Sequence, residues 1–175
     1  MGNLVLRHLS FEKWIEITKL AQELEIPSYN LIAVIAFESA ETFSPQVGNP
    51  KSTAVGLIQI TSVGIQSIPQ YSLDKVGKMN FYDQLWGPVK AYLIANKAEK
   101  LHSLADLYMT VFAPSRRLSP WDFVLYKAPR KSYNDNKLLD KENKGFITKG
   151  DAASQVYRML ERVVLRVKKL DEERI

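Results

Sequence analysis

Seven consecutive apolar residues, Leu31 to Phe37, lead directly into a glutamate, Glu38. A helix that is apolar on every side must be enclosed by other elements, because no face of it meets water favourably. The run therefore predicts a central helix from Ser28, with Glu38 at its end, around which the rest of the fold is arranged. A run this short is also compatible with a buried strand.

The rest of the chain is dominated by helical periodicity. Several segments have one apolar face, and no convincing set of strands is visible. Ser10 and Ser103 stand where the N-caps of two of these segments are expected. We therefore expect a mainly α fold with little or no β-sheet. The amphipathic segments that predict helices are residues 10–24, 80–100, 104–112 and 151–170.

The chain of 175 residues has a length typical of one domain. Its 46% hydrophobic and 25% charged residues are typical of a folded protein rather than a disordered one. We expect residues 1–175 to form a single domain. Its core would comprise about residues 10–112, followed by a basic, loop-rich segment 113–150 and a C-terminal helix 151–170.

The net charge of +5 is concentrated late in the chain. Residues 1–112 contain nine Lys and Arg against ten Asp and Glu, whereas residues 113–175 contain fifteen against nine. A basic region of this kind indicates a polyanionic partner, either nucleic acid, anionic lipid or a bacterial envelope polymer. Charge alone does not select among them.

The chain has no cysteine and two histidines, His8 and His102. Disulfides, thiolate metal ligands and cysteine nucleophiles are therefore excluded. A zinc site or a histidine-based triad is not expected with so few imidazoles. We expect no cofactor and no metal.

The first eight residues lack the basic start and the apolar run of about 7 to 15 residues that a secretory signal needs. No stretch approaches the roughly 20 uncharged apolar residues of a membrane-spanning helix. We expect a protein that is made in the cytoplasm, without a signal peptide and without a membrane span.

Glu38 is the most informative single residue. A carboxylate directly after an apolar run lies at the edge of a desolvated core, and desolvation raises its pKa toward that of a general acid near neutral pH. The alternative is a helix-end glutamate that simply reaches solvent. Local sequence alone favours that alternative, because perturbed carboxylates are few.

Three motifs follow one another around this glutamate: Glu38-Ser39, Asn49-Pro50, and Ala54 to Gln59 with the pattern Ala-x-Gly-Leu-x-Gln. In order and spacing they resemble the lysozyme-like lytic transglycosylase family, to which goose-type lysozymes are related. Weaker matches extend the resemblance over about residues 25–150, toward a phage-associated branch of endolysins and tail lysozymes. The weaker matches are Gln84-Leu85, Val89, Tyr92, Asp106 to Met109 and Pro114.

The resemblance implies an enzyme that cleaves the β-1,4 bond between N-acetylmuramic acid and N-acetylglucosamine in peptidoglycan. Glu38 would be the catalytic acid and then the base. Ser39 would orient its carboxyl group, Gly56 would let the backbone approach the sugar, and Gln59 would offer its amide to the sugar. The residues that the resemblance implies for substrate binding are Ser39, Asn49, Gly56, Gln59 and Tyr108.

Several of these residues have structural alternatives. The Ser39 hydroxyl at a helix end often bonds to its own backbone. Asn49 before a proline is equally a turn residue. Tyr108 lies between apolar neighbours and fits an ordinary helix core.

A hydrolytic lysozyme normally uses a second carboxylate, and none is evident here. This agrees with transglycosylation, in which the C6 hydroxyl of the substrate attacks and leaves a 1,6-anhydro ring, although related goose-type enzymes hydrolyse. Glu41, three residues after Glu38, would either raise the Glu38 pKa by like-charge repulsion or point to solvent beyond the helix end. We expect it to point to solvent.

Residues 140–151 have the frame of a twelve-residue calcium loop, with glycine at the sixth position. Lys144 at the fifth position places a cation where the pattern requires Asp or Asn, and Asp151 is shorter than the usual glutamate at the last. We therefore expect the shape of the loop without the ion.

Between Arg116 and Tyr133, aromatic residues are interspersed among basic ones, a pattern that suits a nucleic-acid surface, a glycan cleft or a merely solvated basic face. We expect peptidoglycan glycan strands as the partner, no nucleic acid, and a monomer that acts on the cell wall. Two other classes remain open: a catalytically silent peptidoglycan-binding or virion structural protein, and a basic nucleic-acid binder.

Overall fold

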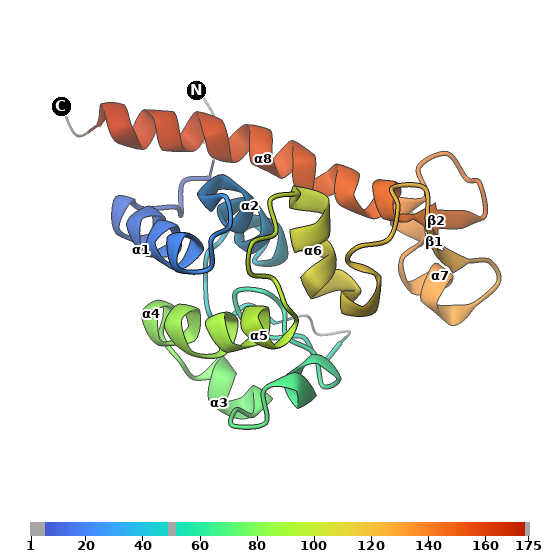
Figure 1. Ribbon diagram of the computed structural model, residues 1–175, viewed down its shortest axis with the longest axis horizontal. Coiled ribbons are helices and arrows are strands. Elements are labelled where there is room, and N and C mark those ends of the chain that lie inside the picture. Colours follow the sequence, from blue (N-terminus) through green and yellow to red (C-terminus); the bar gives the residue numbers. More distant parts are fainter. Residues whose placement is uncertain (1–5, 49–51, 174–175) are drawn as a thin grey trace.

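Helix α2 lies at the centre of a mainly helical arrangement, which confirms the expected mainly α class (Figure 1). The computed structural model describes residues 6–48 and 52–173. The long helix α8 runs along one side and packs against α2 and α6, while α3, α4 and α5 lie on the other side. The α-helices are α1 (Phe11–Glu23), α2 (Ser28–Glu38), α3 (Leu73–Gly77), α4 (Phe81–Gln84), α5 (Lys90–Ala95), α6 (Leu104–Phe112), α7 (Lys131–Asp135) and α8 (Lys149–Glu172).

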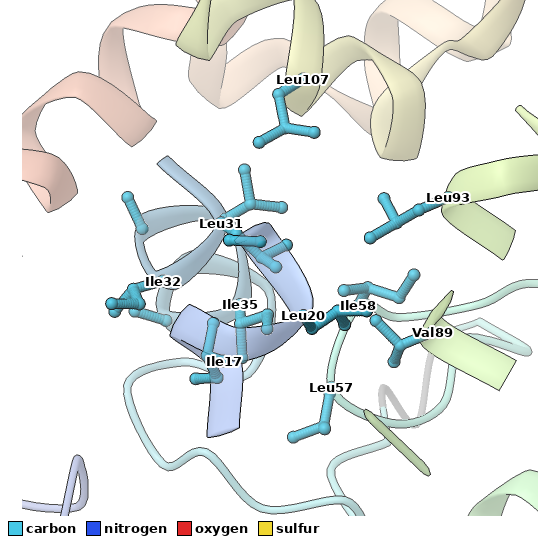
Figure 2. Packing of buried hydrophobic residues seen from close by; sticks show 14 of the residues in the cluster. Ile17, Leu20, Leu31, Ile32, Ile35, Leu57, Ile58, Val89, Leu93 and Leu107 are labelled. Carbon is cyan, nitrogen blue, oxygen red and sulfur yellow. The ribbon is translucent and has the colours of Figure 1, made fainter. Parts of the chain in front are cut away.

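The apolar run forms the buried α2 and not a strand. Residues 30–36 are all buried, and side chains of α1, α5, α6 and the loop after α2 converge on them (Figure 2). A helix with no polar face is stable in this position because neighbours cover every side of it. The hydrophobic cluster continues into α8 through Val156, Val163 and Val167.

The helix starts follow local capping chemistry. The Ser10 and Ser103 hydroxyls accept the backbone N–H groups of Lys13 and Asp106, both at 3.3 Å, as the sequence predicts. In α8, Thr148 and Asp151 form a reciprocal capping box. This box starts α8 at Lys149, two residues before the expected position.

The helix expected over residues 80–100 is interrupted and shorter. A π-helical turn, Leu85–Val89, separates α4 from α5, and α5 ends at Ala95. Pro88 lies in this turn and has no backbone N–H to donate, which disrupts the regular α ladder. The apolar spacing of the segment does not reveal the interruption, because both halves keep one buried face.

The segment 113–150 contains a small antiparallel sheet and α7, which the sequence did not predict. Strand β1 (Val124–Lys127) pairs with β2 (Phe146–Thr148), with Tyr126 opposite Ile147. Strands of three or four residues are too short for a readable alternation. This sheet end of the molecule, β1, α7 and β2, lies beyond α6 (Figure 1).

Among the described residues, no helix has the length and apolarity to cross a membrane.

Candidate active site

Glu38 is the last residue of α2, where the buried helix reaches the edge of the core. Its side chain is half-buried. Burial among protein atoms raises the pKa of the Glu38 carboxyl group to about 8, because the charged form loses solvation. The raised pKa expected from the sequence is therefore present, and the group keeps its proton at neutral pH while part of its surface remains accessible.

Two buried tyrosines from different helices lie near the carboxyl group. Burial raises the pKa of Tyr92, on α5, to about 12, and the negative charge of Glu38 adds to this effect. The same two causes, together with Tyr126, hold the pKa of Tyr108, on α6, well above its usual value. Tyr108 was expected at the site. Tyr92 was a weaker match to the family and was not assigned to the site, because a tyrosine within an amphipathic helix also fits an ordinary core.

A series of aromatic rings leads from the end of α2 to the sheet. The Phe37 and Tyr108 rings meet edge to face with centroids 5.5 Å apart, and Tyr108 stacks on Phe112 at the same distance. Phe112 in turn meets the edge of Tyr126, on β1, at 5.9 Å. Tyr108 is thus both a neighbour of Glu38 and a member of a packed aromatic group.

Ser39 is fully buried, and its hydroxyl has a backbone partner. The Phe43 N–H donates to Ser39 Oγ at 3.1 Å, and the Thr42 hydroxyl donates to the Ser39 carbonyl at 2.6 Å. Among the described residues, no hydrogen bond joins Ser39 to the Glu38 carboxyl group. Its observed role is to hold the turn that follows the glutamate, which is the structural alternative stated above.

This turn, residues 39–43, is conformationally demanding. Ala40, Glu41 and Phe43 all have positive φ, at 48°, 65° and 49°. Residues with side chains adopt this region at a cost, so neighbouring contacts must hold it. Phe43 is completely buried and supplies one such contact.

The expectation that Glu41 points freely to solvent is wrong. Its carboxylate forms a two-pronged ion pair with the Arg162 guanidinium of α8, with Arg162 Nη2 at 2.5 Å from Glu41 Oε2. Arg162 is 121 residues away in the sequence, so no local pattern reveals it. Burial raises the Glu38 pKa, and repulsion by Glu41 is not among the causes.

Gly56, which the resemblance implies for approach to the sugar, is buried, and its open side faces Gln84. It has φ +85°, and a Cβ there would lie 2.5 Å from Gln84 Oε1. Gln84 is fully buried: its Oε1 accepts the Leu57 N–H at 2.6 Å, and its Nε2 donates to the Pro45 and Val76 carbonyls. Because Gly56 has no side chain, it leaves room for that of Gln84, which connects three segments through these hydrogen bonds.

Gln59 also serves its own loop. Its Nε2 donates to the carbonyls of Val47 and Gly56, both at 2.9 Å, and its φ is +50°. The resemblance assigns the Gln59 amide to a sugar, whereas here its N–H groups donate to backbone carbonyls of the protein. Asn49, the remaining candidate for substrate binding, lies outside the described residues.

The loop 140–151 keeps its shape through protein groups. The Asp140 carboxylate accepts the N–H groups of Lys144 and Gly145 at 2.9 and 2.8 Å and the Tyr133 hydroxyl at 2.8 Å. The Lys144 ammonium lies 2.9 Å from both carboxylate oxygens of Asp151. A cationic side chain therefore neutralises the last acid of the loop. Within residues 6–48 and 52–173, no group of three potential metal ligands is found.

The arrangement around Glu38 suits proton transfer. A carboxyl group that stays protonated at neutral pH and is partly accessible can donate its proton to a bound molecule, and the resulting carboxylate can accept one. Tyr92 and Tyr108 place two phenols near this group.

Neither a protein-family model nor a curated protein matches the chain.

Proposed function

We propose that the protein has a lysozyme-like fold and cleaves the glycan strands of peptidoglycan between N-acetylmuramic acid and N-acetylglucosamine, as a lytic transglycosylase. The observation that carries this proposal is the half-buried Glu38 carboxyl group, with a pKa of about 8, at the end of a buried helix and beside two tyrosines. The Glu-Ser, Asn-Pro and Gly-Leu-x-Gln motifs supply the substrate class.

In the first step, protonated Glu38 donates its proton to the glycosidic oxygen while the bond from that oxygen to C1 of the muramic acid breaks. N-acetylglucosamine leaves with a new hydroxyl group. In the second step, the C6 hydroxyl of the same muramic acid attacks C1, and its proton passes to the Glu38 carboxylate. The product is a 1,6-anhydro ring, and Glu38 is protonated again.

Glu41, the acid nearest to Glu38 in the sequence, is paired with Arg162, which favours this route over hydrolysis. A hydrolytic lysozyme uses a second carboxylate to activate water or to stabilise the intermediate. With the C6 hydroxyl as the internal nucleophile, one residue that acts as acid and then base is sufficient. A hydrolytic reaction at the same glutamate is the alternative, and its products differ.

The test is digestion of purified peptidoglycan sacculi followed by mass analysis of the soluble fragments. We expect fragments with 1,6-anhydromuramic acid ends, lost in Glu38→Gln and retained in Glu99→Gln, which neutralises an exposed glutamate elsewhere. Reducing ends in place of anhydro ends would assign hydrolysis. Cleavage that survives Glu38→Gln would contradict the proposal, as would binding of sacculi without any released fragment.

A further inference from the structure

A pocket of about 330 Å³ lies at the sheet end of the molecule, where β1 runs into the start of α7. This volume is at the lower end of the range for small-molecule sites, about 300 to 1,000 Å³. The pocket thus has room for a side group of a polymer. Its lining residues are Val124, Leu125, Tyr126, Lys127, Ala128, Pro129, Arg130 and Ser132.

The pocket is cationic. Lys127 and Arg130 line it, and both are exposed. Within the part of the chain that the structure describes, no carboxylate forms an ion pair with either side chain. Two acids of this end are engaged elsewhere: Asp135 pairs with Lys131, and Asp140 accepts hydrogen bonds from its own loop and from a tyrosine hydroxyl. Two cations without partners on a concave surface favour an anionic ligand.

The pocket is connected to the candidate active site by Tyr126. This residue lines the pocket, its ring lies 5.9 Å from that of Phe112, and it contributes to the raised pKa of Tyr108. The ring contacts continue from Phe112 through Tyr108 to Phe37, the residue before Glu38. A polymer that is bound at Glu38 and follows these aromatic rings would place its side groups at Lys127 and Arg130.

We propose that this pocket binds the carboxylates of the peptide stems attached to muramic acid. The inference depends on the proposed function and specifies which part of peptidoglycan is recognised. The sugars of the glycan are uncharged, whereas each stem peptide, joined through the lactyl group of muramic acid, has free carboxylates. Arg130 has the planar fork that binds a carboxylate through two hydrogen bonds, and Lys127 adds a second charge.

Phosphate groups of wall polymers are the other anionic source. They are attached to the C6 oxygen of muramic acid, which is the nucleophile of the proposed reaction. A residue substituted there has no free hydroxyl to form the anhydro ring. The stem peptide leaves C6 free, so it is the substituent compatible with cleavage at the muramic acid in the site.

The test compares glycan strands that have their stem peptides with strands from which an amidase has removed them. We expect the wild-type protein to cleave the peptide-bearing strands roughly tenfold faster, the ratio that one charge-assisted hydrogen-bonded contact of about 1.4 kcal/mol provides. Lys127→Gln/Arg130→Gln should cleave both kinds of strand at the lower rate. The matched control Lys137→Gln/Lys141→Gln removes two exposed charges outside the pocket and should keep the preference.

A binding measurement separates this inference from the proposed function. In the Glu38→Gln background, isothermal titration with a disaccharide tetrapeptide and with the same disaccharide without peptide gives a ratio of affinities that needs no catalysis. A preference of about tenfold that disappears in Lys127→Gln/Arg130→Gln supports the pocket even if no variant cleaves glycan. An unchanged ratio in that double variant overturns the inference. So does binding of poly(glycerol phosphate) that depends on the two cations while stem-peptide binding does not.

Discussion

Glu38 shows how one residue combines accessibility with desolvation. It is the first polar residue after seven apolar ones, so the preceding helix is buried and the carboxyl group lies at the boundary. Partial exposure allows contact with a ligand, and surrounding protein atoms raise the pKa to about 8. These two properties together are required of a general acid at neutral pH.

The raised pKa makes a prediction about stability that does not depend on the proposed function. The folded protein holds the Glu38 proton up to about pH 8, whereas the unfolded chain releases it near pH 4.5. The folded state therefore binds more protons between these values, and the free energy of unfolding falls as pH rises through this range. Relative to wild type, Glu38→Gln should gain about 2 to 4 kcal/mol between pH 5 and pH 9, less than the full pKa difference implies because the side chain is partly exposed.

Urea unfolding of both proteins at pH 5, 7 and 9 measures this difference. Glu99→Gln, at an exposed position, should run parallel to wild type at every pH. A Glu38→Gln curve that also runs parallel to wild type would show that the Glu38 pKa is not raised.

Under the proposed function, the cleavage rate of the wild type should in addition fall about tenfold for each pH unit above 8.

Alanine substitutions at Gly56 and Gly145 separate the cost of backbone strain alone from the cost of strain together with a steric conflict. Both have positive φ, at +85° and +79°. A Cβ at Gly56 would meet Gln84, which three hydrogen bonds hold in place, whereas a Cβ at Gly145 would have nothing within 4 Å. We expect Gly145→Ala to cost about 1 kcal/mol of unfolding free energy and Gly56→Ala about 3 kcal/mol or more. Equal costs, measured by denaturant unfolding, would mean that Gln84 moves aside without loss.

Between elements, the turn after α2 connects the candidate acid to α8. Residues 39–43 pass through three left-handed conformations, and Glu41 within this turn pairs with Arg162. Helix α8 also packs directly on α2. The longest helix therefore fixes both the helix that ends in Glu38 and the turn that leaves it.

The Glu41–Arg162 pair should contribute measurably because it is partly buried. Its side chains are 33% and 42% exposed, against 77% and 74% for the pair between Asp74 of α3 and Lys78, which follows that helix. In double-mutant cycles with glutamine or asparagine replacements, we expect a coupling energy of about 1 kcal/mol for the first pair and about 0.3 kcal/mol for the second. Exchange of the two charges, Glu41→Arg with Arg162→Glu, should recover part of the loss. Coupling energies of the same size in both pairs would argue against a role in holding the turn.

At the scale of the whole molecule, one hydrophobic cluster extends from Leu6 to Leu170. It includes buried residues of α1, α2, α5, α6 and α8. Leu125 of β1, and Leu139 between α7 and β2, are partly buried against this cluster. Tyr133 and Ile147, buried residues of the sheet end, are not part of the cluster.

This division predicts two levels of stability. Amides of α2 and α6 should exchange with solvent only through global unfolding, because they lie in the main core. Amides of β1 and β2 should exchange through a local opening that costs about 2 kcal/mol less. Native-state hydrogen exchange at increasing denaturant measures both values, and a single common value would show that the sheet end unfolds with the core.

Much of the helical framework was predictable because its causes are local. The apolar run predicted a buried helix, with a buried strand as the alternative, and the hydroxyls of Ser10 and Ser103 indicated where two other helices begin. The raised pKa of Glu38 was one of two possibilities, and local sequence favoured the other, a glutamate that reaches solvent; the burial that raises the pKa depends on packing. The small sheet was not predictable, because its strands are short and their pairing joins segments about twenty residues apart.

By itself, the sequence determined the buried helix and the starts of two others, and it placed one carboxyl group at the end of the buried helix, since hydrophobic periodicity and capping act over a few residues. Only the tertiary structure decided what surrounds that group. Tyr92 beside Glu38, Arg162 against Glu41 and Gln84 against Gly56 are contacts between distant segments. Such contacts depend on how the helices pack, and packing is set by the shape of the whole core, which no short segment of sequence specifies.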